Sequence, residues 1–130
     1  MIIKLDITGD VPIYQQIRNQ IVYGVATGQL SIGERLPTVR QLAGDIGVNP
    51  MTVSKAYGLL KDEGIIVIDR RQGAKINRLP VDDKALNEEF DQKVKLLISE
   101  ARMKGISQDE IRKHINQLID NVYEKKEGLH

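Results

Sequence analysis

Hydrophobic residues recur along this 130-residue chain with a period that changes from one stretch to the next. Residues 2–8 alternate apolar and polar side chains, which predicts a short β-strand. From about Pro12 to Thr27 an aliphatic residue returns at every fourth position, which predicts one long amphipathic helix. Two further helical stripes follow beyond residue 84, so the chain is expected to be mainly helical.

The middle of the chain carries start and stop signals for a short helix. Thr38 precedes an apolar-periodic run, and Gln41 follows it by three residues. This is a capping box, in which the Thr38 hydroxyl accepts a bond from an unpaired backbone N–H while Gln41 reaches back to the cap. Gly47 ends the run, because glycine readily takes the left-handed conformation of a helix C-terminus. We therefore predict a helix over residues 39–46.

A second helix and a hairpin are predicted directly after it. Asn49 is a favourable N-cap, and Pro50 fills the first helical position, where its missing N–H costs nothing. The helix runs from about Met51 to about Glu63, followed by β-branched residues 65–68, a turn at 69–73 and a returning strand at 74–76. This order is that of a winged helix-turn-helix, whose second helix usually enters a DNA major groove.

Three motifs at the matching spacing carry a family resemblance. Residues 36–43, Leu-Pro-Thr-Val-Arg-Gln-Leu-Ala, resemble the Leu-Pro-Ser-x-Arg-x-Leu-Ala motif of the GntR family of bacterial transcription regulators. Residues 49–57, Asn-Pro-Met-Thr-Val-Ser-Lys-Ala-Tyr, resemble the Asn-Pro-Asn-Thr-Val-x-Lys-Ala-Tyr version of its YtrA-like and MocR-like branches. Residues 12–17 are similar to the family's first-helix signature, and the resemblance covers about residues 10–78. Met51 replaces a polar residue of the family pattern.

The resemblance and the positions together indicate a DNA-binding surface. The candidate DNA-binding residues are Arg40, Asn49, Pro50, Met51, Thr52, Ser54, Lys55, Arg70, Arg71, Gln72 and Gly73. In the family the residue that matches Arg40 contacts DNA, and Lys55 is expected to face a phosphate. Asn49 and Thr52 have an equally good local explanation as helix-capping residues. At the wing tip, arginine suits the negative potential of a minor groove, and glycine lets the backbone approach it closely.

The last third of the chain predicts a dimerisation device. We divide the chain into a winged-helix domain (1–78), a linker (79–83) and a two-helix tail (84–127), with a capping box at Ser107 and Glu110. Two wide apolar stripes make a poor core alone, so a second copy is expected to cover them; folding back onto the same chain is the alternative. The predicted interface residues are Leu86, Phe90, Val94, Leu97, Ile98, Ile111, Ile115, Leu118, Ile119 and Val122.

Composition argues against an enzyme. The chain has no cysteine and no phosphate-cradling glycine loop, and its two histidines, His114 and His130, lack partners at metal-ligand spacing, so no metal, cofactor or catalytic residue is expected. The absence of cysteine and of signal or membrane segments favours the cytoplasm. Residues 1–80 hold 10 Lys/Arg against 7 Asp/Glu, whereas residues 81–130 hold 9 against 11, which fits a protein that meets phosphates with one end.

These observations combine into one prediction. The fold class is α+β, mainly α, with an N-terminal winged helix-turn-helix and a C-terminal two-helix dimerisation hairpin. The resemblance implies a homodimeric YtrA-like repressor, in that branch often of transporter genes, which binds double-stranded DNA with a two-fold related operator and carries no large effector domain. A winged-helix protein–protein interaction module without sequence-specific DNA binding is the alternative.

Overall fold

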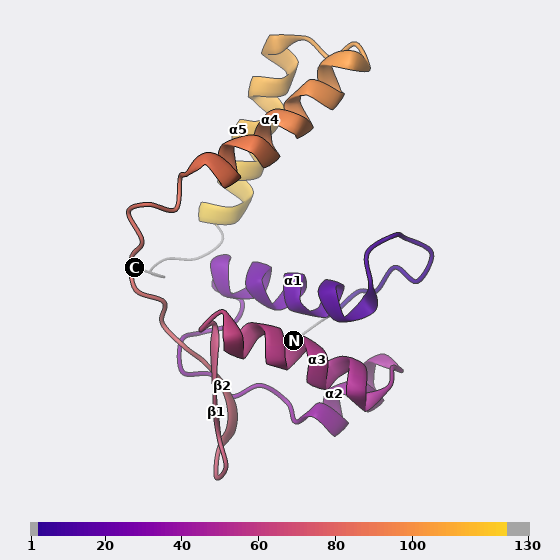
Figure 1. Cartoon of the computed structure of the whole chain (residues 1–130), viewed down its shortest axis with the longest axis vertical. Helices are drawn as coiled ribbons and strands as arrows, with labels where there is room; N and C mark the ends of the chain where they lie inside the picture. Colours follow the sequence, from indigo (N-terminus) through magenta and orange to yellow (C-terminus); the bar gives the residue numbers. More distant parts are fainter. Residues whose placement is uncertain (1–2, 125–130) are drawn as a thin grey trace. The chain divides into compact units, whose positions relative to one another are not determined.

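The computed structural model describes residues 3–124 and divides them into two compact units, with the division between Leu79 and Pro80. Met1, Ile2 and residues 125–130 lie outside the described residues; they include the start of the predicted strand, the end of the predicted tail and His130. The first unit holds three helices and a β-hairpin, and the second is a pair of helices (Figure 1). The mainly helical α+β architecture is thus confirmed.

The first helix, α1 (Ile13–Ala26), is one residue shorter at each end than its apolar pattern predicts. It buries Ile17 and Ile21 completely against the rest of the first unit. Thr27 follows the helix and is also fully buried. Its hydroxyl donates a hydrogen bond to the Tyr23 carbonyl (2.9 Å), so the buried polar group is satisfied.

The predicted strand at the N-terminus is wrong: residues 3–8 form no ladder with another strand. Their backbone is paired instead with amide side chains of α1. Gln16 Oε1 accepts the Asp6 N–H (2.8 Å) and its Nε2 donates to the Asp6 carbonyl (2.8 Å), while Gln20 bonds both polar backbone groups of Lys4. The apolar alternation is nevertheless used, because Ile3 and Leu5 pack against the core.

The helix-turn-helix consists of α2 (Val39–Ile46) and α3 (Pro50–Asp62). The capping box of Thr38 and Gln41 is present at the start of α2, with both reciprocal bonds formed. Gly47 ends α2 in the left-handed conformation, at φ 71°. Because the chain reverses at this one residue, only three residues separate the end of α2 from the start of α3, and the two helices pack beside each other (Figure 1).

The wing is an antiparallel hairpin of β1 (Ile66–Asp69) and β2 (Gly73–Ile76), in the register Ile66 opposite Ile76. Residues 33–36 run along the free edge of β2 and are bonded to it through the Leu36 N–H and the Ala74 carbonyl (2.8 Å). This third segment joins the wing to the loop before α2. One face of the hairpin therefore closes the core of the first unit.

The core of the first unit draws on every element within it. Fully buried aliphatic residues come from α1 (Ile17, Ile21), α3 (Leu60) and the wing (Ile66, Ile76). Such burial is the main stabilising term of a small domain, at about 25 cal/mol per Å² of apolar surface. The first unit is in this sense complete within a single chain.

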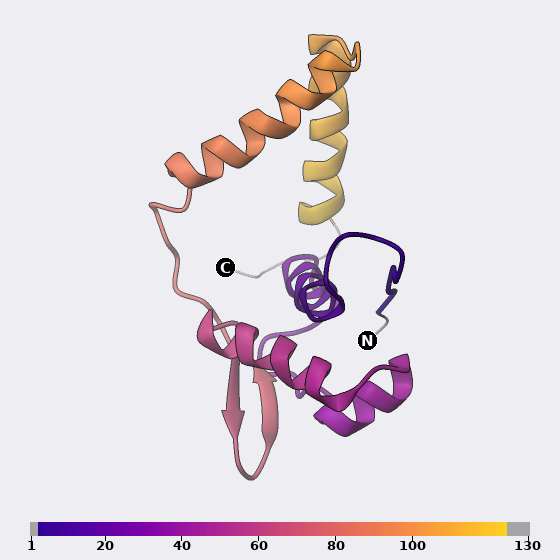
Figure 2. The ribbon, with the colours of Figure 1, turned by 45° about the vertical axis from the view of Figure 1, so that its right-hand side comes forward.

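The second unit consists of α4 (Glu88–Met103) and α5 (Gln108–Tyr123). The predicted capping box of Ser107 and Glu110 is present. Leu86 precedes α4, whose cap is Asn87, so the expectation that the helical stripe begins at Leu86 is wrong. Figure 2 shows α4 and α5 diverging from the loop that joins them, and neither helix contains a buried residue.

Candidate nucleic-acid interface

The start of α3 is built by the two residues that precede and open it. Asn49 Oδ1 accepts the backbone N–H of Met51 at 2.7 Å, and Pro50 follows at the first helical position. The Thr52 N–H donates to the Asn49 carbonyl (3.0 Å), and Thr52 is half-buried. The carboxamide oxygen of Asn49 is therefore engaged in capping, while its NH₂ group is left to reach outward.

The two faces of α3 differ in character. The inner face buries Val53, Ala56 and Leu60. On the outer face Met51 is 79% exposed, and Ser54 and Lys55 are also exposed. This amphipathic division leaves the first turns of the helix open to a partner, as the prediction for this helix requires.

Lys55 is held by a contact that its sequence position does not reveal. Its ammonium lies 4.0 Å from the centroid of the Tyr14 ring of α1, within the range of a cation–π interaction. Tyr14 is half-buried and packs against the core, so it offers a fixed platform for a flexible side chain. Tyr14 is absent from the predicted site, although it lies within residues 12–17, the segment that is similar to the family's first-helix signature.

Tyr57 is a core residue of the first unit and is not available to stack on a base. Its side chain is 4% exposed, and its hydroxyl donates to the Pro37 carbonyl at 2.7 Å. Burial raises the pKa of Tyr57 to about 12, so the hydroxyl stays protonated and keeps donating at neutral pH. The bond ties α3 to the loop that leads into α2.

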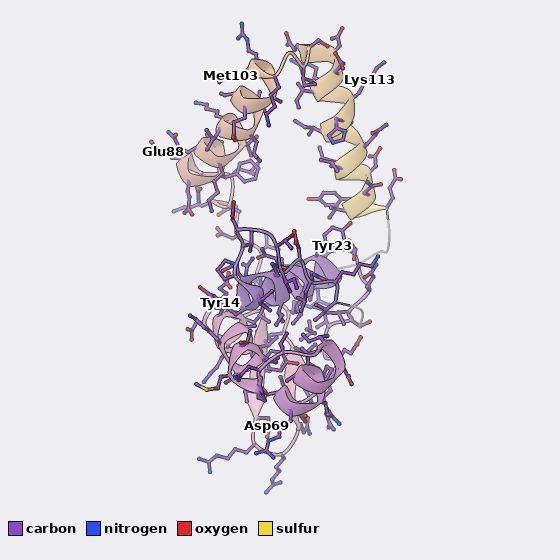
Figure 3. The ribbon with its side chains drawn as sticks, turned by 90° about the vertical axis from the view of Figure 1, so that its right-hand side faces the viewer. Tyr14, Tyr23, Asp69, Glu88, Met103 and Lys113 are labelled. Carbon is purple, nitrogen blue, oxygen red and sulfur yellow. The ribbon has the colours of Figure 1, made fainter. Side chains whose placement is uncertain are left out.

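The cationic candidates outside α3 are exposed. Arg40 is the second residue of α2, directly after the capped start of that helix. At the wing tip Arg70, Arg71 and Gln72 are exposed, in the turn that follows Asp69 (Figure 3). Asp69 Oδ1 accepts the Arg71 N–H at 2.7 Å, which fixes the turn, and none of these three arginines forms an ion pair within residues 3–124.

Gly73 closes the wing tip with a φ of 74°. A Cβ built at this position would meet no atom within 4 Å, so space alone does not demand glycine. The left-handed backbone does, because L side chains disfavour that region. The tip is thus a tight turn that carries two exposed arginines.

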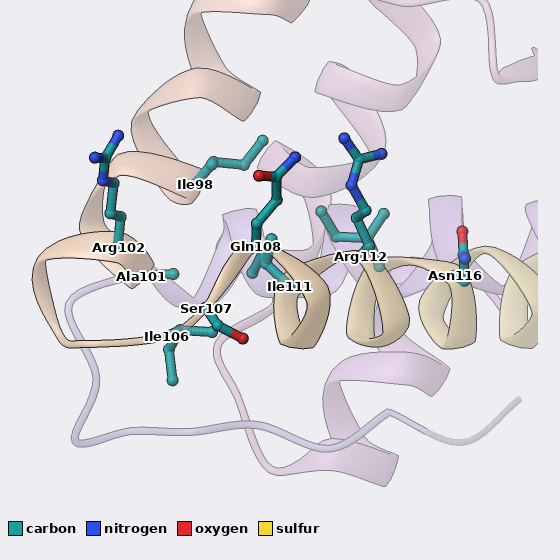
Figure 4. A pocket seen from close by; sticks show the side chains of 10 residues that line it. Ile98, Ala101, Arg102, Ile106, Ser107, Gln108, Ile111, Arg112 and Asn116 are labelled. Atoms are coloured by element: carbon teal, nitrogen blue, oxygen red, sulfur yellow. The ribbon is translucent and has the colours of Figure 1, made fainter.

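None of the predicted interface residues of the tail is buried in a single chain. Leu97 is 66% exposed and Leu118 is 50% exposed. The expected stripe also lines a cleft of about 780 Å³ between α4 and α5, with Ile98, Ile111 and Ile115 among its walls. Figure 4 shows the side chains of Arg102, Gln108 and Arg112 pointing the same way along this cleft.

The described residues hold neither a cluster of metal-ligating side chains nor a membrane-spanning helix. Across the described part of the chain, no group of three or more His, Cys, Asp or Glu is placed to hold a metal ion. His114 is exposed on α5. Among the helices of residues 3–124, none combines the length and apolar character that crossing a membrane requires.

Comparison with known proteins places this geometry among bacterial regulators. Residues 12–76 match the model of the family described as bacterial regulatory proteins, gntR family. The chain is 34% identical over 124 residues to the HTH-type transcriptional repressor YtrA of Bacillus subtilis, covering 92% of this chain and 94% of that protein. It is 32% identical over 119 residues to the HTH-type transcriptional regulator Rv1152 of Mycobacterium tuberculosis, covering 92% and 95%. It is also similar to the crystal structure of a transcriptional antiterminator from Listeria monocytogenes EGD-e, with a TM-score of 0.81, 29% identity and 98% of both chains covered.

Proposed function

The chain belongs to the GntR family, in its YtrA-like branch, and from that premise we propose that it is a homodimeric repressor of an operon that encodes a transporter. As a member of this family it is a DNA-binding transcriptional regulator and not an enzyme. What the proposal adds is the mode of DNA binding, the dimer, the repressing action and the kind of target gene.

In the proposed complex the first turns of α3 enter the major groove. The observation that carries this placement is the capped, exposed start of the helix. Met51, Ser54 and Lys55 are exposed there and are not part of the hydrophobic core. Arg40 and Lys55 meet phosphates, while Arg70 and Arg71 of the wing lie over the adjacent minor groove. Phosphate contacts supply most of the affinity, and the α3 residues supply the discrimination.

Dimerisation through the tail is supported by the absence of a buried core in residues 80–124. Within residues 80–124 no side chain is buried, although α4 and α5 carry well-formed apolar stripes. A helix pair that exposes Phe90, Leu97 and Leu118 gains stability only from a further surface. A second copy supplies an identical stripe under two-fold symmetry, and the operator then carries two related half-sites about one helical turn apart, or a multiple of it.

The repressing action is supported by the relative of Bacillus subtilis, which is named a repressor and aligns over nearly its whole length. The YtrA-like resemblance implies a transporter operon as the target. A dimer that covers a promoter blocks polymerase by occupancy alone.

The proposal is tested by selecting bound fragments from the genomic DNA of the source organism with the purified full-length protein. We expect enrichment of a two-fold symmetric sequence upstream of a transporter operon, and increased transcription of that operon when the gene is deleted. Sedimentation at micromolar concentration should show a dimer. Enrichment without symmetry, a monomeric protein, or decreased transcription in the deletion strain would each contradict the corresponding part of the proposal.

A further inference from the structure

Met51 is an exposed apolar side chain at the point where α3 begins. It is 79% exposed, and it contributes to no core cluster among the described residues. Its backbone N–H is held by Asn49 Oδ1, so the cap fixes where the side chain starts. The fold therefore positions Met51 without using its thioether.

Two residues with little or no side chain follow Met51 on the outward face of α3. Ser54 lies three residues further along α3 and Gly58 seven residues further, so both share its outward face. A Cβ added at Gly58 would meet no atom within 4 Å, although glycine inside a helix is destabilising relative to alanine. Lys55 shares this face, but its ammonium lies over the Tyr14 ring of α1. The small side chains of Ser54 and Gly58 therefore let the helix approach a groove floor closely, which brings the longer Met51 side chain to the base edges.

The chemistry of Met51 restricts what it can recognise there. A thioether donates no hydrogen bond and accepts only weakly, so it cannot distinguish the donor and acceptor patterns of the bases. The apolar feature of the major groove is the C5-methyl group of thymine, which apolar side chains contact. We propose that Met51 reads one thymine methyl group in each operator half-site and is a specificity-determining residue of this protein.

This inference rests on the proposed placement of α3 in the major groove, and a methyl deletion in the DNA tests it. Duplexes are first selected from a random library with the full-length protein. Each thymine of the selected half-site is then replaced by deoxyuridine, which keeps the base pair and removes only the methyl group. For the wild type we expect one position at which this replacement weakens binding about fourfold, the value for one buried methyl-sized group. Replacing the equivalent thymines of both half-sites should weaken it by roughly the square of that factor.

The variant Met51→Ala should bind the thymine duplex more weakly and lose its sensitivity to deoxyuridine at that position alone. Met103→Ala is the matched control, because Met103 is also highly exposed, at 87%, but lies at the end of α4 (Figure 3). It should keep the full methyl sensitivity. Thermal melts of both variants should match the wild type, since neither side chain is buried.

The outcomes separate the two proposals. If specific duplexes are enriched but no thymine shows methyl sensitivity, or if Met51→Ala keeps the sensitivity of the wild type, the assignment of Met51 is overturned and the proposed function stands. If no duplex is enriched over random sequence, the proposed mode of DNA binding is overturned, and the assignment of Met51 with it.

Discussion

The two units of this chain bury their apolar residues to opposite extents. In the first unit Ile17, Ile21 and Leu60 are completely inaccessible. In the second unit Leu97 is 66% exposed, and no residue between 80 and 124 is buried. Both units nevertheless start a helix with a complete capping box, at Thr38 and at Ser107. Local helix chemistry therefore does not decide which unit is self-sufficient; the area that its helices can bury does.

The difference predicts that the two units fail in different ways. Damage to the first unit should unfold it at any protein concentration. Damage to the second should act through association, and should therefore depend on concentration and change DNA affinity indirectly. The predictions that follow begin with the largest expected effect.

Truncation after Pro80 should leave a folded monomer that binds a half-site weakly. Two linked half-site contacts raise the effective local concentration, so we expect binding to a full operator to weaken by about 10²–10⁴-fold. Sedimentation and a titration of operator DNA measure the two effects. A truncated protein that stays dimeric, or that keeps full affinity, would assign dimerisation to the first unit.

A single charge in the tail should reproduce much of this loss. Leu97→Asp places an uncompensated charge in the predicted interface. Leu96→Asp is the matched control, because Leu96 is similarly exposed, at 62% against 66%, but lies off the predicted stripe. Only the change at residue 97 should produce monomers. Equal behaviour of the two variants would remove the stripe from the interface.

Leu60→Ala should cost about 2–5 kcal/mol of stability, as is usual when a fully buried leucine is truncated. The loss should be the same at high and low protein concentration. Leu97→Ala should destabilise the protein by an amount that grows with protein concentration, because it weakens the association that stabilises the wild type, and the loss should vanish where both proteins are monomeric. Urea denaturation at two concentrations a hundredfold apart distinguishes them. If the loss for Leu60→Ala depended on protein concentration, the first unit would also be stabilised by association.

Arg40→Ala should weaken operator binding by roughly 1–3 kcal/mol and lower the slope of log affinity against log salt by about one. Arg102→Ala in the tail removes an exposed arginine of the same charge and should change neither quantity. Titrations at several salt concentrations check both variants. Unchanged affinity of Arg40→Ala, with its fold intact, would remove Arg40 from the site.

The sequence predicts the winged helix-turn-helix better than any other part, because short-range chemistry defines it. Thr38 with Gln41, Gly47, and Asn49 with Pro50 each fix a helix end within a few residues. Most of the candidate site inherits its position from those ends. The bounds of α2 are predicted to the residue because Thr38 and Gly47 mark its two ends.

Contacts between distant residues could not be predicted in this way. Residues 3–8 alternate like a strand, but their backbone partners are Gln16 and Gln20, whose amide groups act in place of a neighbouring strand. The platform that Tyr14 gives to Lys55 joins two residues from different helices. Periodicity reports which face is apolar, and it does not report which polar side chain will meet which backbone group.

Asn49→Ala should lower stability by about 0.5–2 kcal/mol, because the Met51 N–H loses its cap. Asn49→Ser restores a capping oxygen without the carboxamide NH₂ group. If that group reads a base, the serine variant should recover stability but keep an altered base preference. Melts and selection from random duplexes measure the two properties. Full recovery of both would assign Asn49 a capping role alone.

The smallest effect is expected at the contact between α1 and α3. Tyr14→Leu removes the ring that holds the Lys55 ammonium, and it should weaken operator binding by about 0.5–1 kcal/mol, the worth of an exposed cation–π contact. Lys55→Ala should weaken binding to all sequences about equally, since a phosphate contact carries no base information. If Tyr14 acts through Lys55, the double variant should bind no more weakly than Lys55→Ala alone. Tyr14→Phe keeps the ring and should bind like the wild type. Tyr23→Leu, also on α1 but with no cation over its ring among residues 3–124, controls for general effects on that helix. Additive losses in the double variant would show that Tyr14 and Lys55 act independently. The contact would then join α1 to α3 without a role in DNA binding.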